Sequence, residues 1–211
     1  MDHSKIRKVD QLSSKHPHFL LPYQGKVFFF VLFIFFLSII FQYTLNKLIK
    51  VSPMKFHSTT NQELESCTST LCETFEQVSQ NSTNVIYVAN TIIGHNLRSY
   101  FYLVLDKNYF YIFTPLFSVV DLGSFLGRTV YSDGSVFITE LLLPHGIFEM
   151  SGLILFVSLY YAVLGNILIY FKNKIPLWYY GKRILIQIGI VILLDIIAGF
   201  FEALAFTAKY N

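Results

Sequence analysis

Long apolar stretches separated by polar ones dominate this sequence. Val27 to Leu45 runs for nineteen residues without a charged side chain, and the stretches Ile147 to Phe171 and Ile184 to Phe206 are longer still. An α-helix needs about 20 mainly apolar residues to cross the hydrocarbon core of a bilayer. Each of these stretches therefore predicts a transmembrane helix.

Two less regular apolar stretches lie between the first long one and the second. Residues 83 to 105 are interrupted by polar side chains, and Tyr109 to Gly127 follows after a short Asp106-Lys-Asn108 turn. The pair predicts a helical hairpin. Because Arg98 near mid-membrane would cost about 2.5 to 3.5 kcal/mol, residues 83 to 105 either cross the membrane or lie in its interface. The predicted fold is an all-α integral membrane protein, a bundle of about five transmembrane helices.

One of these helices is predicted to be broken. Arg128 to Ser135 reads as a loop, since Asp133-Gly134 is a turn signal. Val136 to Leu143 is then a half-helix that ends at Pro144-His-Gly146. Pro144 lacks an amide hydrogen and Gly146 tolerates unusual backbone angles, so a new helix should begin beside Gly146.

The distribution of charge predicts how the chain is threaded through the membrane. Residues 1 to 26 form a basic tail, and the loop at 172 to 183 holds four cations and no acid. Basic segments favour the cytoplasm, so the N-terminus is expected inside and the C-terminus outside the cell membrane. Residues 46 to 82, which are rich in polar side chains, should then lie outside, followed by a helical membrane domain at 83 to 207.

Composition narrows the functional classes. The chain is 54% hydrophobic and 14% charged, which is typical of a multi-pass membrane protein. The sequence lacks the pattern of basic residues with interleaved aromatic residues that would indicate nucleic-acid binding. Cys67 and Cys72 are too few for a zinc or iron–sulfur cluster, so no metal or cofactor is expected. Outside the cell they would either form a small disulfide loop or remain thiols.

Several ionisable side chains fall inside the predicted membrane domain. Such groups usually face a bundle interior or water. His145 and Glu149 share a helix face, and so do Asp195 and Glu202. We expect Glu149 and Glu202 to meet beside His145. Glu149 either binds a ligand, ion or partner, or accepts hydrogen bonds from the free amides of the helix that Gly146 begins. The full candidate set is Asp121, Glu140, His145, Glu149, Asp195 and Glu202.

A resemblance to a known family adds to this interpretation. Leu143-Pro-His-Gly-Ile-Phe-Glu149 resembles the signature of the stage II sporulation protein M family of multi-spanning membrane proteins. Asn96-Leu-Arg98, Gly123-Ser-Phe-Leu-Gly127 and Ala198-Gly-Phe-Phe-Glu-Ala203 are similar to further motifs of that family. Leu122 stands where the family usually has Asn, and Met150-Ser-Gly152 where Leu-Pro-Ala is common, as in a divergent member. Gly123 and Gly127 also form a GxxxG pair, which favours close helix packing over phosphate binding.

Three functional classes can be compared with this pattern. The resemblance implies a non-enzymatic membrane anchor or scaffold, which would hold partners in cell-envelope remodelling or sporulation engulfment. A transporter-like component for export, maturation or immunity, for example in a circular bacteriocin system, is the alternative, because a broken helix can form a binding site at membrane depth. An enzyme is disfavoured, since the sequence has no zinc-protease motif, nucleophile elbow or Walker loop.

Overall fold

The computed structural model describes residues 21, 23–49, 84–105, 112–136, 145–173 and 180–210. These residues form five α-helices and no strand, so the predicted all-α fold is confirmed. The helices are α2 (Gln24–Ile49), α5 (Val85–Leu105), α6 (Thr114–Val136), α7 (Ile147–Asn173) and α8 (Gly181–Tyr210).

The predicted number of membrane spans is only partly confirmed. Within the described residues three helical stretches are long and apolar enough to cross a membrane, at Gln24–Ile49, Ile147–Leu168 and Gly181–Ala205. The other two helices are long enough but too polar, because α5 carries Asn90, Asn96 and Arg98 and α6 carries Asp121, Arg128 and Asp133. The chain thus combines three strongly apolar helices with a more polar helical pair.

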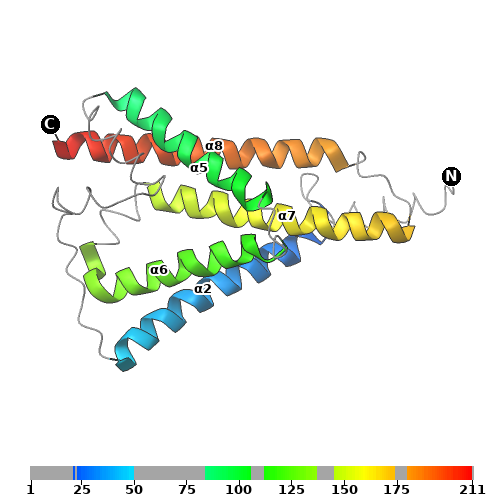
Figure 1. The fold of residues 1–211 in the computed structure, drawn as a ribbon, viewed down its shortest axis with the longest axis horizontal. Helices are drawn as coiled ribbons and strands as arrows, with labels where there is room; N and C mark the ends of the chain where they lie inside the picture. The colour runs from blue at the N-terminus through cyan, green and yellow to red at the C-terminus, as the bar shows by residue number, and fades with distance from the viewer. Residues whose placement is uncertain are drawn as a thin grey trace.

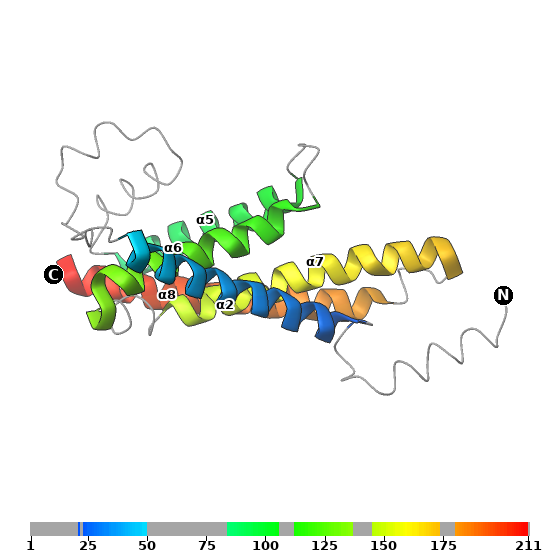
Figure 2. The same cartoon turned by 90° about the horizontal axis from the view of Figure 1, so that it is seen from below.

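The helices are arranged as two pairs with α7 between them (Figure 1). α2 packs along α6, and α5 packs on α8, while α7 contacts both α2 and α8. Successive helices run in opposite directions, so α2, α6 and α8 point one way and α5 and α7 the other. Seen from below, α7 extends beyond α5 and α6 at the end where α8 begins (Figure 2).

Small residues set the close contact between α2 and α6. A Cβ atom on Gly123 would lie 2.8 Å from the Phe35 carbonyl oxygen, and one on Gly127 would clash with the Ile39 carbonyl oxygen. Only glycine lets the two backbones approach this closely. Apolar side chains of α2, α6 and α7 fill the rest of this core: Val31, Phe35, Val119, Leu126, Ile154 and Val157.

The second pair is held in a similar way. A Cβ on Gly199 of α8 would lie 2.5 Å from Cγ1 of Ile93 on α5. Val88, Ala89 and Ala203 pack beside this crossing and are fully buried. α5 is thereby fixed on α8 even though it makes little contact with α6, its neighbour in the sequence.

A buried amide pair joins the first and last helices. The Gln187 Nε2 donates to Oε1 of Gln24 at 2.7 Å, and the Gln24 Nε2 donates in return to Oε1 of Gln187. The backbone N–H of Leu21 also donates to Gln24 Oε1, at 2.8 Å. Both glutamines are at most 1% exposed. These bonds fix the start of α2 against α8.

The predicted loop at 128 to 135 is wrong, because α6 continues as a helix to Val136. The Thr129 hydroxyl donates to the Phe125 carbonyl oxygen and the Ser132 hydroxyl to that of Arg128. Such bonds back to the preceding turn are compatible with a helix. A single glycine inside a helix costs only about 1 kcal/mol relative to alanine, so Asp133-Gly134 does not end it.

Several sequence predictions lie outside the described residues. These are the break at Pro144, the acid Glu140, the paired cysteines Cys67 and Cys72, and most of the polar segment and of the N-terminal tail. On the far side of the predicted break, His145 and Gly146 form one π-helical turn that leads into α7.

Candidate functional site

Acidic side chains gather where α5, α7 and α8 meet. Glu149 comes from the first turn of α7, and Asp195 and Glu202 lie two turns apart on one face of α8. The charges of Glu149 and Asp195 act on Glu202, so the three carboxyl groups share one region of the bundle. We call Glu149, Asp195 and Glu202 the acidic cluster. The structure thus brings together three of the side chains singled out in the sequence.

α5 covers the acidic cluster with a tyrosine and an asparagine. Tyr100 is 9% exposed, and both Asp195 and Glu149 act on it electrostatically. Asn96, one turn earlier in α5, faces Asp195. Their contact does not have the geometry of a hydrogen bond, because Nδ2 of Asn96 and both carboxyl oxygens of Asp195 are buried without a partner.

Asp195 is the most deeply buried member of the acidic cluster. It is completely buried, and within the described residues neither of its carboxyl oxygens has a hydrogen-bond partner. Buried charges in proteins are normally paired or hydrogen-bonded. A buried acid left without such a partner is costly for folding, which is a common property of sites kept for function.

Close packing holds the backbone around the acidic cluster. A Cβ atom on Gly152 of α7 would lie 3.2 Å from the Tyr100 hydroxyl oxygen, so the Tyr100 side chain reaches from α5 to the α7 backbone there. The Tyr100 ring stacks on Phe156, with centroids 4.9 Å apart. Phe148 of α7 stacks on Phe201 of α8 at 5.7 Å. Aromatic contacts on both sides therefore fix how α7 and α8 present their carboxyl groups.

Within the described residues no hydrogen bond or ion pair joins His145 to Glu149, the two side chains that were expected to share a helix face. His145 lies in the π-turn before α7, and its Nδ1 is buried without a hydrogen bond. Glu149 interacts instead with the acids of α8. Within the described ranges, no three His, Cys, Asp or Glu side chains are placed to hold a metal ion together.

Asp121 lies outside the acidic cluster and does not face the bundle interior. It is exposed on α6, whereas Pro115, Val119 and Gly123 of the same helix are buried. A residue two positions from Gly123 is turned about 200° from it around the helix. Because the glycines face α2, Asp121 must face outward.

Arg98, from the Asn-Leu-Arg motif, also faces outward. Its guanidinium carbon lies 6.0 Å from the centroid of the Tyr102 ring, on the exposed side of α5. The neighbouring Asn96 points inward to Asp195. The motif therefore places one polar side chain on each side of α5.

Sequence reasoning missed Tyr100 and the glutamine pair. Tyr100 stands one helical turn after Asn96, so the two residues share a face of α5. Their spacing in the sequence was a signal that Tyr100 lies near the same site. Nothing local connects Gln24 with Gln187, because 163 residues separate them and Gln24 fell in the predicted tail.

The comparisons with known proteins add no relative. No family model, curated protein or solved structure matches this chain.

Proposed function

We propose that this chain is a multi-pass membrane protein, without catalysis of its own, that anchors other membrane or envelope proteins. The observation that carries the proposal is the outward side of α6. Phe117, Asp121, Phe125 and Arg128 are all exposed there, and their spacing places them within one stripe along the helix. We call these four residues the outer face of α6.

The outer face of α6 is unsuited to lipid. An Asp or Arg at the centre of a membrane helix costs about 2.5 to 3.5 kcal/mol on insertion scales. Within the described residues neither Asp121 nor Arg128 has a side-chain hydrogen bond or an ion pair to offset that cost. Contact with another protein would remove both groups from lipid, which is the role that an anchor requires.

Other observations support the same proposal. Three helices can cross a membrane and successive helices alternate in direction, as a chain threaded five times would require. The motifs that resemble those of the stage II sporulation protein M family imply an anchor of this kind. We therefore include in the proposal the N-terminus inside, the C-terminus outside and a helix broken at Pro144-His-Gly146.

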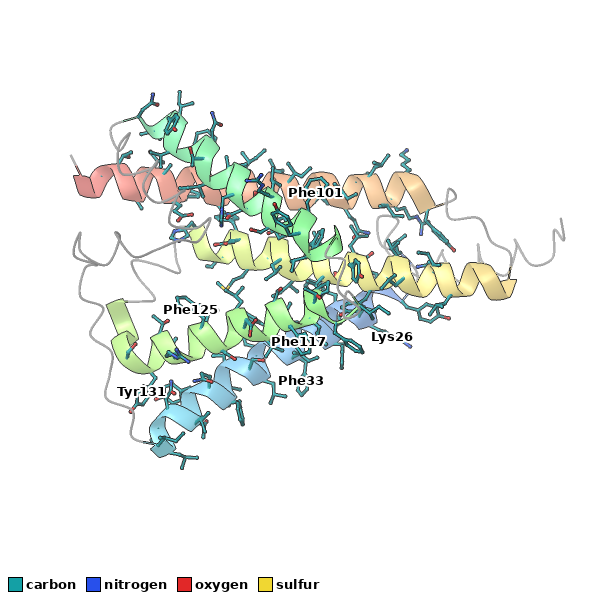
Figure 3. The ribbon with its side chains drawn as sticks, in the orientation of Figure 1. Lys26, Phe33, Phe101, Phe117, Phe125 and Tyr131 are labelled. Carbon is teal, nitrogen blue, oxygen red and sulfur yellow. The ribbon has the colours of Figure 1, made fainter. Side chains whose placement is uncertain are left out.

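Photo-crosslinking in native membranes tests the anchor proposal. A benzophenone amino acid at position 125 lies on the outer face of α6, and one at position 33 lies among the exposed phenylalanines of α2 (Figure 3). We expect a discrete protein adduct from position 125 and none from position 33. Absence of protein adducts from position 125 and from other outward positions on α5 and α6 would contradict an anchoring role.

An ion-coupled transporter is the second candidate, and the acidic cluster is the observation that favours it. Buried carboxyl groups without a cation can carry protons or bind a small cation during transport. In proteoliposomes with an internal pH dye and an imposed potential, this function requires a proton or cation flux. Asp195→Asn should abolish that flux while the protein stays folded, and no flux from the wild-type protein would rule out this candidate.

A further inference from the structure

Asp121 lies close to the mid-depth of the membrane if α2 spans it. Gly123 packs against Phe35 and Ser38, which stand in the middle of the Gln24–Ile49 span. Asp121 precedes Gly123 by two residues, or about 3 Å along the helix axis. The packing of α6 on α2 thus fixes the depth of an exposed carboxyl group, although α6 itself is too polar to be recognised as a span.

The outer face of α6 carries its charges in a fixed order. Arg128 stands seven residues after Asp121, about 10 Å further along the same face, toward the end where α2 finishes. Phe117 and Phe125 are 57% and 46% exposed and stand one turn on either side of Asp121. The face therefore presents an acid between two aromatic rings, followed by a base.

We propose that the outer face of α6 binds a transmembrane helix of a partner protein that carries Lys or Arg at mid-membrane, opposite Asp121. This inference rests on the anchoring function proposed above and specifies the partner. Phe117 and Phe125 pack on the apolar turns that flank the partner's basic residue. The partner helix also has an acidic or amide side chain about two turns away, at the depth of Arg128.

A second copy of this chain does not fit the same face. Two copies inserted in the same orientation are related by an axis along the membrane normal, which keeps every residue at its own depth. Asp121 would then meet Asp121, and Arg128 would meet Arg128. Like charges at contact distance oppose association, so charge complementarity favours a different protein with the reversed pattern.

A designed peptide provides the test. The probe is a Leu/Ala transmembrane helix with one central Lys, its control has Leu at that position, and a third peptide has Glu there. Binding is measured by energy transfer to labelled full-length protein in phosphatidylcholine vesicles. We expect the Lys peptide to bind the wild-type protein at least about tenfold more tightly than the Leu control, equivalent to about 1.4 kcal/mol.

Charge variants make the result specific. Asp121→Asn should remove the preference for the Lys peptide, and Asp121→Lys should transfer it to the Glu peptide. Asp121 contacts no other described side chain through a hydrogen bond or ion pair, so both variants should keep the wild-type thermal stability. A loss of stability would show that Asp121 supports the fold instead and would overturn the inference.

Other outcomes separate this inference from the anchoring function. Equal binding of the Lys and Leu peptides would overturn the inference. Self-association of the wild-type protein that is lost in Asp121→Asn would also overturn it, because the outer face of α6 would then bind a second copy of this chain. If position 125 still crosslinks to a protein in either case, the anchoring function stands and only the chemistry assigned to the partner is wrong.

Discussion

At the scale of single residues, Asp195 is the side chain whose environment most needs a functional explanation. It is fully buried, both carboxyl oxygens lack hydrogen bonds, and its neighbours include two further acids. The sequence indicated that Asp195 and Glu202 share a face, because they are seven residues apart in one helix. It could not show that α5 covers them with Tyr100, since that contact depends on how α5 crosses α8.

Asp195→Asn is expected to stabilise the protein. The substitution removes a buried charge without changing the size of the side chain. A buried polar group without a partner costs about 1 to 3 kcal/mol when neutral and more when charged, so a gain of about 1 kcal/mol in the free energy of unfolding is expected. Thermal unfolding in detergent checks this, and a clear loss of stability would show that the carboxylate has an essential partner.

The Gln24 and Gln187 pair predicts a strongly non-additive response. Gln24→Leu alone removes the two hydrogen bonds of the reciprocal pair from the buried Gln187 amide, at a cost of about 1 to 3 kcal/mol. Gln187→Leu alone should cost a similar amount. The double variant replaces both amides with apolar side chains, so it should be more stable than either single variant. A double-mutant cycle of unfolding free energies measures the coupling, and additive losses would argue against the reciprocal pair.

At the scale of elements, apolar patterning predicted the helices well and the polar connections poorly. The stretch 27 to 45 became α2, and 83 to 105 became α5, because long apolar or amphipathic stretches leave few alternatives to a helix. The predicted loop at 128 to 135 is wrong because the turn tendency of Asp133-Gly134 is only a local signal, which takes no account of how α6 packs. In the structure, packing of Gly127 and Leu126 on α2 and α7 keeps α6 helical beyond them.

Gly127→Ala tests how far α6 depends on close approach to α2. The added methyl group would clash with the Ile39 carbonyl oxygen, which belongs to a helix backbone and cannot move aside easily. Overpacking of this kind costs about 1 to 3 kcal/mol. Gly165→Ala in α7 is the matched control, because nothing lies within 4 Å of its Cβ position. That change should be neutral or stabilising by up to about 1 kcal/mol through helix propensity.

The two glycine variants are compared by thermal unfolding of the purified protein. The expected result is a lower midpoint for Gly127→Ala and an unchanged or higher one for Gly165→Ala. If both variants behave alike, the close contact between α2 and α6 does not contribute to stability.

At the scale of the whole molecule, the helix directions place the start of α2 and the end of α8 on opposite sides of the membrane, whether or not α5 and α6 cross it. α5 runs opposite to α2, and α6 returns in the direction of α2. Whether this pair crosses the bilayer or only enters it, α7 begins on the side where α2 ends. The three strongly apolar helices therefore imply the same placement of the ends as five full spans.

Cysteine labelling tests this topology. In a background without Cys67 and Cys72, a single cysteine at position 60 should react with an impermeant maleimide on intact cells, because it follows the α2 span. A cysteine at position 174, just after α7, should react only once the membrane is permeabilised. The basic residues Lys26, Lys182 and Arg183 lie in the first turns of α2 and α8, which start at the end of the bundle where α7 finishes, and they favour the cytoplasm. Labelling of position 174 on intact cells would reverse the orientation, and with it the depth order of Asp121 and Arg128 that a partner helix must match.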